Sequence, residues 1–219
     1  MLSLSDIELR ITEIFVSLQG ETDTAGLVTT FIRLTGCPLR CQYCDTAYAF
    51  SGGNKQTIQS IVDEVSGSGT DYVTVTGGEP LSQPNVHFLL SSLCDLGLVV
   101  SLETSGALDI SNVDSRVVKI IDVKTPGSGE VARNRYQNLA TLQVSDQIKF
   151  VICNKNDYLW AKMKCEELQL YDLGCEVLFS PSSDELASRD LADWIVEDRL
   201  PVRMQIQLHK LLWQDEAGR

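Results

Sequence analysis

The sequence has few basic residues and no long apolar run, and each absence excludes a class of function. Lysine and arginine total 18 against 30 aspartates and glutamates, which gives a formal net charge of −12 over 219 residues. A surface this negative repels phosphate backbones and argues against broad nucleic-acid binding. No stretch approaches the roughly 20 apolar residues of a transmembrane helix, and residues 1–8 lack the features of a secretory signal. We therefore expect a cytoplasmic protein with no nucleic-acid or membrane partner.

Histidines number only two, and a second Cys-x-x-Cys knuckle is missing, although seven cysteines are present. In a cytoplasmic chain these thiols do not indicate a disulfide framework. Four of them are scattered among apolar or helical segments, and we expect them to be buried as small hydrophobic residues: Cys94, Cys153, Cys165 and Cys175. The other three crowd into residues 37–44, and this spacing calls for a separate explanation.

Strand-like and helix-like segments alternate along the chain, without a long linker or an internal repeat. Strands are expected at 8–18, 27–35, 72–76, 99–103, 117–123, 147–152, 176–179 and 202–207, and helices at 57–66, 84–96, 157–173 and 184–198. Repeated β-α units predict a parallel sheet with right-handed crossovers. About six parallel strands are too few for a complete eight-fold barrel. We therefore predict one α/β domain over residues 1–219, an open, partial TIM-like (β/α) barrel, with a doubly wound sheet as the alternative.

Polar, glycine-rich segments fall where the predicted strands end. They are residues 76–80, 103–106, 122–125 and 180–181, and the cysteine-rich segment 37–44 also follows a strand. In both candidate folds, function gathers at the carboxyl ends of the parallel strands. We therefore expect these segments to face one common cavity.

The three clustered cysteines, Cys37, Cys41 and Cys44, allow several interpretations. Their spacing would place three buried thiols on one face of a helix, but Gly36 and Pro38 favour an irregular loop. Structural zinc and electron-transfer clusters both normally take four protein ligands. Three ligands leave one coordination position for a substrate or cofactor, as in a catalytic metal site.

The pattern Cys-x-x-x-Cys-x-aromatic-Cys, with Tyr43 as the aromatic residue, resembles the cluster motif of the radical S-adenosylmethionine (SAM) superfamily. In that superfamily three cysteines hold a [4Fe–4S] cluster, and its fourth iron binds S-adenosylmethionine. A second segment, Gly77-Gly78-Glu79-Pro80, resembles the superfamily's Gly-Gly-Glu-Pro segment, whose backbone lies against the methionine amino group. Glycine suits such a close approach of backbone to ligand.

Further segments resemble one family, 7-carboxy-7-deazaguanine synthase, over about residues 12–210. They are residues 14–21, Phe31-Ile-Arg33, Cys44-Asp45-Thr46, residues 76–80, residues 103–106 and Gln207-Leu-His209-Lys210. The resemblance implies a homodimeric lyase of queuosine (7-deazapurine) biosynthesis. Such an enzyme converts 6-carboxy-5,6,7,8-tetrahydropterin to 7-carboxy-7-deazaguanine by radical ring contraction with loss of ammonia. The resemblance also implies a [4Fe–4S] cluster, S-adenosylmethionine and Mg²⁺ as cofactors, and an external reductant of the flavodoxin or ferredoxin type.

The resemblance also implies a role for individual residues. Cys37, Cys41 and Cys44 would hold the cluster, and the Thr46 hydroxyl would bind Mg²⁺, which prefers oxygen ligands. Arg33 would bind the substrate carboxylate through its two-point fork. The other implied substrate contacts are Leu18, Gln19, Gly20, Glu21 and Thr76, and the implied S-adenosylmethionine contacts are Gly78, Glu103, Asp122, Val123, Lys124 and Ser180. No side chain is implied as a catalytic acid or base, and we expect His209 to be a packed or surface residue.

The sequence departs from the family pattern in three places. Asp122-Val123-Lys124 stands where members more often have Ser-Pro-Lys, and Ser180-Pro181 where they have Gln-Pro. Some members end soon after the His-Lys segment with a proline, whereas here residues 211–219 continue without one. Two alternatives stay open: a glycyl-radical-enzyme activase of the same superfamily, and a metal-binding or redox-sensing protein without catalytic activity.

Overall fold

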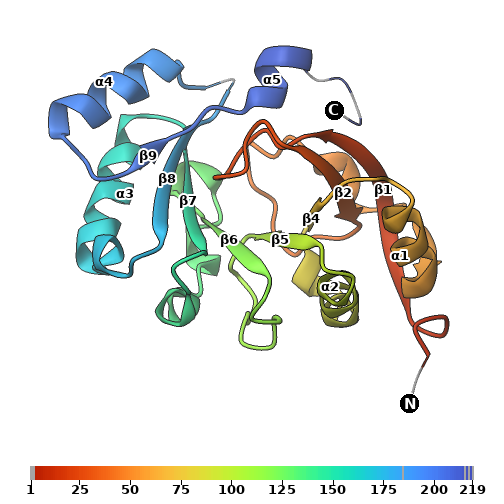
Figure 1. Cartoon of the computed structure of the whole chain (residues 1–219). Helices are drawn as coiled ribbons and strands as arrows, with labels where there is room; N and C mark the ends of the chain where they lie inside the picture. Colours follow the sequence, from red (N-terminus) through yellow and green to blue (C-terminus); the bar gives the residue numbers. More distant parts are fainter. Residues whose placement is uncertain (1–2, 184, 215, 217, 219) are drawn as a thin grey trace.

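The computed structural model describes residues 3–183, 185–214, 216 and 218 (Figure 1). The strands are β1 (Glu8–Leu18), β2 (Val28–Leu34), β3 (Asn54–Thr57), β4 (Tyr72–Gly77), β5 (Val99–Thr104), β6 (Val118–Val123), β7 (Gln147–Ile152), β8 (Glu176–Pro181) and β9 (Arg203–Met204). The α-helices are α1 (Ile58–Ser66), α2 (Val86–Asp95), α3 (Lys155–Glu167), α4 (Ser188–Asp198) and α5 (Leu208–Trp213). None of these helices has the length and hydropathy of a membrane-spanning segment.

The described strands form one sheet in the order β3-β1-β2-β4-β5-β6-β7-β8-β9. From β2 through β4 to β9 neighbouring strands pair in parallel, whereas β1 pairs antiparallel with β2 and β3. The described edge strands β3 and β9 have a neighbour on one side only, so the barrel stays open. The predicted α/β class and open, partial barrel are confirmed, with an antiparallel β1–β2 hairpin added at one side.

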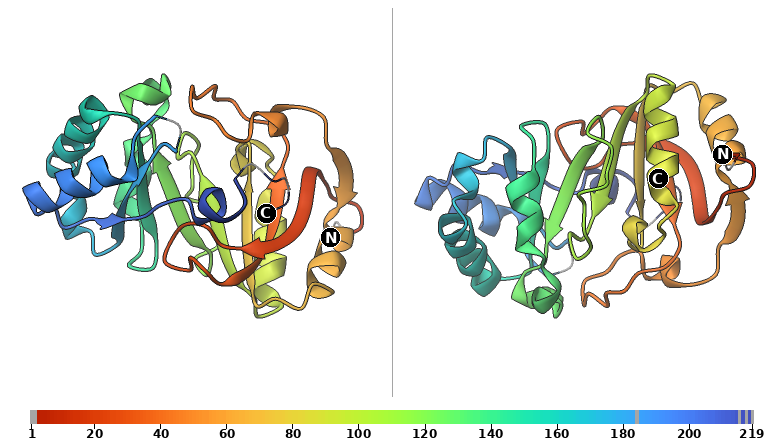
Figure 2. Two further views of the ribbon diagram at one scale, coloured as in Figure 1. Left: turned by 90° about the horizontal axis from the view of Figure 1, so that it is seen from above. Right: turned by 90° about the horizontal axis from the view of Figure 1, so that it is seen from below.

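The two faces of the curved sheet differ in chemistry, because successive side chains of a strand point to opposite faces. On β7, Ile148, Phe150 and Ile152 belong to the hydrophobic core, whereas Lys149 and Val151 line a cavity. Buried side chains of α1 to α4 pack into the same core. Figure 2, seen from above, shows α5 lying across the middle of the molecule, above the strand ends.

Most predicted elements form where the sequence places them, and the differences have local causes. Thr57 caps α1 as expected, accepting from the Ser60 N–H at 3.2 Å. α3 begins earlier than predicted, because the Asn154 side chain accepts from two N–H groups of the first turn. The same helix ends before residue 173, at Glu167, close to Gln169, whose φ of 51° is left-handed.

Other boundaries also differ. The helix expected over 84–96 begins at Val86, and the one over 184–198 begins at Ser188. Asp184 lies outside the described residues, as do residues 215, 217 and 219 of the tail 211–219. The strand predicted at 202–207 is reduced to Arg203–Met204. β3 and α5 were not predicted, since one is short and polar and the other has only six residues.

A fully buried carboxylate, Glu79, joins the ends of β4 and β5. It accepts hydrogen bonds from the Leu81 N–H at 3.0 Å, the Thr104 hydroxyl at 2.8 Å, and the N–H of Ser105 at 2.7 Å. The Ser105 hydroxyl donates to it as well. Because charged groups are buried only when several donors satisfy them, this carboxylate fixes the geometry of both strand ends.

We expect Glu79→Ala to lower the free energy of unfolding by about 3 kcal/mol, because several buried donors lose their acceptor. Urea unfolding followed by circular dichroism measures this change. Glu64→Ala, at an exposed position of α1, is the matched control and should stay within about 0.5 kcal/mol of the unsubstituted chain. Equal stability of the two variants would contradict the role given to Glu79.

Candidate functional site

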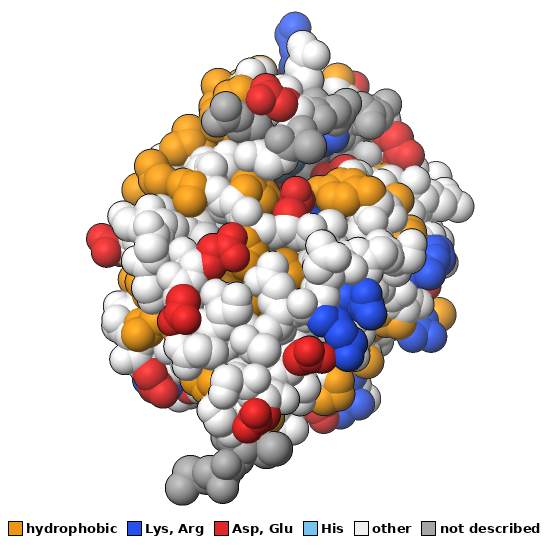
Figure 3. Space-filling view, turned by 90° about the vertical axis from the view of Figure 1, so that its right-hand side faces the viewer, with side chains coloured by type: hydrophobic (Ala, Val, Ile, Leu, Met, Phe, Trp, Pro, Cys, Tyr) orange, Lys and Arg blue, Asp and Glu red, His pale blue; other side chains and the backbone are white. Residues whose placement is uncertain are grey.

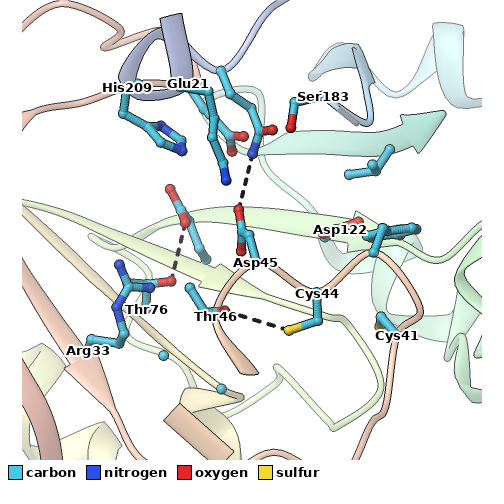
Figure 4. Close-up of a pocket in the computed structure, with 18 of the residues that line it drawn as sticks. Glu21, Arg33, Cys41, Cys44, Asp45, Thr46, Thr76, Asp122, Ser183 and His209 are labelled. Atoms are coloured by element: carbon cyan, nitrogen blue, oxygen red, sulfur yellow. Dashed lines mark hydrogen bonds between the residues drawn. The ribbon is translucent and has the colours of Figure 1, made fainter. Parts of the chain in front are cut away.

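A cavity of about 730 Å³ opens at the carboxyl ends of the parallel strands. Its volume is within the range of about 300–1,000 Å³ typical of small-molecule sites. Figure 4 shows side chains from the hairpin, the cysteine loop, β4, β6 and α5 converging on it. The predicted site residues that line it are Leu18, Gln19, Gly20, Glu21, Arg33, Cys37, Cys41, Cys44, Thr46, Thr76, Gly78, Glu103, Asp122 and Lys124.

Two predicted site residues do not line this cavity. Val123 is 3% exposed and its side chain belongs to the hydrophobic core. Ser180 is 1% exposed on β8, and Ser182 and Ser183, just beyond that strand, line the cavity instead. Near these two positions, any contact with a ligand falls to the backbone or to neighbouring residues.

The cysteine loop, residues 37–44, is irregular, so the interpretation of three thiols on one helix face is wrong. Gly36 begins the loop with a φ of +100°, a conformation that favours glycine. Its N–H donates to the Ala49 carbonyl at 2.8 Å, and the Gln42 N–H donates to the Ser128 carbonyl at 3.0 Å. These backbone bonds hold the loop at the cavity wall.

The chemistry of the three thiols fits an iron–sulfur cluster. All are free, and burial raises the pKa of Cys37 and that of Cys41, the latter to about 11. Cys37 and Cys41 therefore stay protonated at neutral pH until a metal displaces the proton. Within the described residues, no three His, Cys, Asp or Glu side chains form a group that could hold a single metal ion. Each thiolate of a four-iron cluster binds a different iron, so the cysteines need not converge on one point.

The end of β4 packs directly against this loop. A Cβ at Gly78 would stand 2.3 Å from the Gly36 carbonyl oxygen and 2.9 Å from the Cys37 Cβ. The Glu79 N–H donates to the same carbonyl at 2.8 Å. The Gly-Gly-Glu-Pro segment thus positions the first cysteine, and only a glycine at position 78 allows the two backbones to approach so closely.

Two buried lysines each hold a carboxylate in the cavity wall. The Lys149 ammonium donates to Glu21 Oε2, and the Lys124 ammonium donates to Asp122 Oδ2 at 2.7 Å. Burial alone would lower the pKa of both lysines, but the facing carboxylates raise it above the ordinary value. Both amines are therefore charged at neutral pH.

Glu103, an implied S-adenosylmethionine contact, is hydrogen-bonded to Gln19 and Thr76, which are implied substrate contacts. Its carboxylate accepts from Gln19 Nε2 and from the Thr76 hydroxyl, each at 3.3 Å. Burial raises the pKa of Glu103, the nearby Glu21 raises it further, and Lys149 opposes that rise. The structure therefore brings predicted substrate contacts and a predicted cofactor contact into one network.

Arg33 lies between two aromatic rings at the side of the cavity. Its Nε donates to Glu13 Oε1 at 2.7 Å, and its guanidinium carbon is 5.7 Å from the Phe15 ring centroid and 5.8 Å from that of Tyr48. The Tyr48 hydroxyl donates to the same Glu13 oxygen at 2.8 Å. These contacts fix the plane of the guanidinium, and its terminal nitrogens make no hydrogen bond within the described part of the chain, so they are open to a ligand.

The short helix α5 closes one side of the cavity. The Leu208 N–H donates to the Gly20 carbonyl at 3.0 Å, and a Cβ at Gly20 would stand 2.3 Å from His209 Nδ1. Gln207 donates to the Asp45 carboxylate at 3.4 Å. His209 is packed, as expected, but it also lines the cavity, and burial lowers its pKa.

Thr46 lies beside the last cysteine. Its hydroxyl is 3.8 Å from Cys44 Sγ, and Figure 4 shows both side chains at the cavity. A single hydroxyl oxygen fits Mg²⁺ when water and substrate oxygens complete the shell.

Sequence reasoning missed Lys149 and Glu79. Lys149 is the one charged residue of a strand that is otherwise apolar from Ile148 to Ile152, and that exception was the available signal. The Glu79 carboxylate was part of a recognised segment, but its bracing role depends on Thr104 and Ser105, which only the fold brings near.

Comparisons with known proteins identify the family to which this chain is similar. Residues 31–122 match the Radical SAM superfamily. The chain is 44% identical to the 7-carboxy-7-deazaguanine synthase of Chlorobaculum tepidum, covering 97% of this chain and 98% of that protein. It is 41% identical to that of Koribacter versatilis, covering 95% and 99%.

A solved structure shows the same fold. The crystal structure of QueE from Escherichia coli superposes with a TM-score of 0.76 at 22% identity, covering 92% of this chain and 95% of that chain. Streptococcus suis SuiB bound to S-adenosylmethionine gives 0.56 at 13% identity, covering 81% and 47%.

We expect Cys41→Ala to lose most of the iron and sulfide bound after anaerobic reconstitution, because a cluster ligand is removed. Cys94→Ala, at a buried thiol outside the cavity, is the matched control and should retain the full content. Iron and sulfide analysis with the visible absorption spectrum measures both. Zinc in place of iron, or equal iron in the two variants, would contradict the cluster assignment.

Proposed function

Since this chain belongs to the 7-carboxy-7-deazaguanine synthase family of the radical SAM superfamily, we propose that its cavity holds 6-carboxy-5,6,7,8-tetrahydropterin beside S-adenosylmethionine. Its activity is that of a 7-carboxy-7-deazaguanine synthase, a radical SAM lyase. The proposed reaction contracts the pterin ring with loss of ammonia, for queuosine or another 7-deazapurine. Membership of this family leaves the activase and the non-catalytic alternatives without support.

One observation carries the proposal: three free thiols and an array of lysine-held carboxylates line the same cavity. When bound, the cluster and S-adenosylmethionine supply one-electron and radical chemistry, and the protein supplies position and electrostatics. The chain's own residues then have to bind two ligands, orient them and exclude water.

For the cofactor, we assign the cluster to Cys37, Cys41 and Cys44. The S-adenosylmethionine contacts are proposed at Gly78, Glu103, Asp122 and Lys124, with backbone contacts near Val123 and Ser180. Asp122 supports this assignment, because its Oδ1 is buried and has no hydrogen-bond partner among the described residues. A buried oxygen of this kind indicates a ligand that donates a hydrogen bond.

For the substrate, we assign Leu18, Gln19, Gly20, Glu21 and Thr76 to the pterin edge and Arg33 to its carboxylate. The Arg33 guanidinium is already oriented by Glu13 and two rings, which lowers the cost of ordering it on binding. Mg²⁺ would be held by the Thr46 hydroxyl, with water and substrate oxygens completing its shell.

The proposal includes an external one-electron reductant, a cytoplasmic location and a homodimer. All seven cysteines are free thiols, as in reducing compartments. On the hairpin, Val16, Leu27 and Val28 are 43%, 40% and 54% exposed. Figure 3 shows hydrophobic side chains gathered on the upper part of the face that carries β1 and α1. A second copy would cover such side chains, and sedimentation equilibrium tests for it.

We expect reduced, reconstituted protein with S-adenosylmethionine, Mg²⁺ and 6-carboxytetrahydropterin to form 7-carboxy-7-deazaguanine. Arg33→Lys should raise the KM for the pterin about tenfold or more, because an ammonium cannot reproduce the two-point fork. Arg116→Lys, at a half-exposed surface ion pair, is the control and should leave the KM unchanged.

Chromatography with mass detection measures the product and 5′-deoxyadenosine together. Accumulation of 5′-deoxyadenosine without 7-carboxy-7-deazaguanine would show that the substrate is a different molecule.

A further inference from the structure

Glu21 is a buried carboxylate with one oxygen engaged and one oxygen unpartnered. It is 6% exposed and lines the cavity. Its Oε2 accepts from the Lys149 ammonium, whereas its Oε1 has no hydrogen-bond partner among the described residues. Since leaving a buried acceptor unpaired costs about 1–3 kcal/mol, Oε1 indicates a donor group on a ligand.

Lys149 is the cation nearest this carboxylate, and it is itself enclosed. It is 9% exposed on β7, where its register partner on β6 is Asp122. Glu21, Asp122 and Glu103 all raise the pKa of its ammonium against the opposing effect of burial. Lys149 thus lies close enough to three carboxylates to feel their charge, although Asp122 is itself bound by Lys124.

We propose that Lys149 is a positioning residue for the substrate, which acts by holding Glu21 through Oε2 so that Oε1 is presented to an N–H group of the substrate. This inference rests on the proposed function, in which Glu21 meets the pterin edge. The amino and ring N–H groups of a 2-aminopyrimidinone are donors of the kind that Oε1 accepts.

The choice of lysine follows from its geometry. An ammonium is a point charge that contacts one carboxylate oxygen, whereas a guanidinium fork engages both oxygens at once. With arginine at position 149, Oε1 would be occupied before the substrate arrived. A lysine therefore engages Oε2 of Glu21 while leaving Oε1 as an acceptor for the ligand.

The test compares Lys149→Met and Lys149→Arg in the reconstituted holoenzyme. Both should raise the KM for 6-carboxytetrahydropterin at least tenfold, and both should raise it several-fold more than they raise the KM for S-adenosylmethionine. A role in charge balance alone would instead let Lys149→Arg restore the pterin KM, which would overturn the inference.

A double-substitution cycle tests whether Lys149 acts through Glu21. If it does, Lys149→Met combined with Glu21→Gln should raise the pterin KM no more than Glu21→Gln alone, within about twofold. Multiplied effects of the two substitutions would show that Lys149 acts independently and would overturn the inference. Lys149→Gln, which keeps a polar group, replaces the methionine variant if that variant fails to bind its cluster.

The matched control is Lys119→Met. Lys119 is 5% exposed on β6 and is 3.1 Å from Asp146, but it does not line the cavity. The Lys119→Met variant should lose thermal stability, while its KM values for 6-carboxytetrahydropterin and for S-adenosylmethionine stay within twofold of those of the unsubstituted enzyme. Product formation by the unsubstituted enzyme separates the proposed substrate from the proposed role of Lys149. If that enzyme forms no product, the proposed substrate is refuted. If it forms product and Lys149→Met leaves the pterin KM unchanged, only the role of Lys149 is refuted.

Discussion

The backbones of Gly36 and Gly78 approach so closely that a single Cβ on the second would stand 2.3 Å from the carbonyl oxygen of the first. This contact joins the start of the cysteine loop to the end of β4, and the Glu79 N–H bonds across it. The buried Glu79 carboxylate then extends the connection to the end of β5. The position of the cluster ligands relative to the cavity floor depends on this chain of contacts.

The same edge of the sheet holds an uneven distribution of charge. The chain as a whole is strongly acidic, yet its cavity contains Arg33, Lys124 and Lys149. Each is held against a carboxylate, so each pair is nearly neutral while its parts remain available to ligands. Buried pairs of this kind add little to stability because desolvation offsets their attraction, and their place in the cavity wall fits a role in recognition.

Sequence patterns correctly predicted those helices and strands that depend only on neighbouring residues. Thr57 as a cap and Gln147–Ile152 as a strand needed only their neighbours in sequence. The predicted boundaries of α3 were wrong because single residues decide where this helix begins and ends, namely the Asn154 cap and the left-handed Gln169. The strand expected at 202–207 shrank to two residues because pairing with β8 is a tertiary property.

By itself, the sequence determined the residue types of the site: three thiols in the spacing of the cysteine loop and the glycines that allow close approach. The reason is that residue type and spacing set which metals and ligands a segment can hold. Only the tertiary structure decided which groups meet, pairing Lys149 with Glu21, 128 residues away in sequence, and placing Val123 in the core. Such contacts depend on strand order and register, which no local pattern encodes.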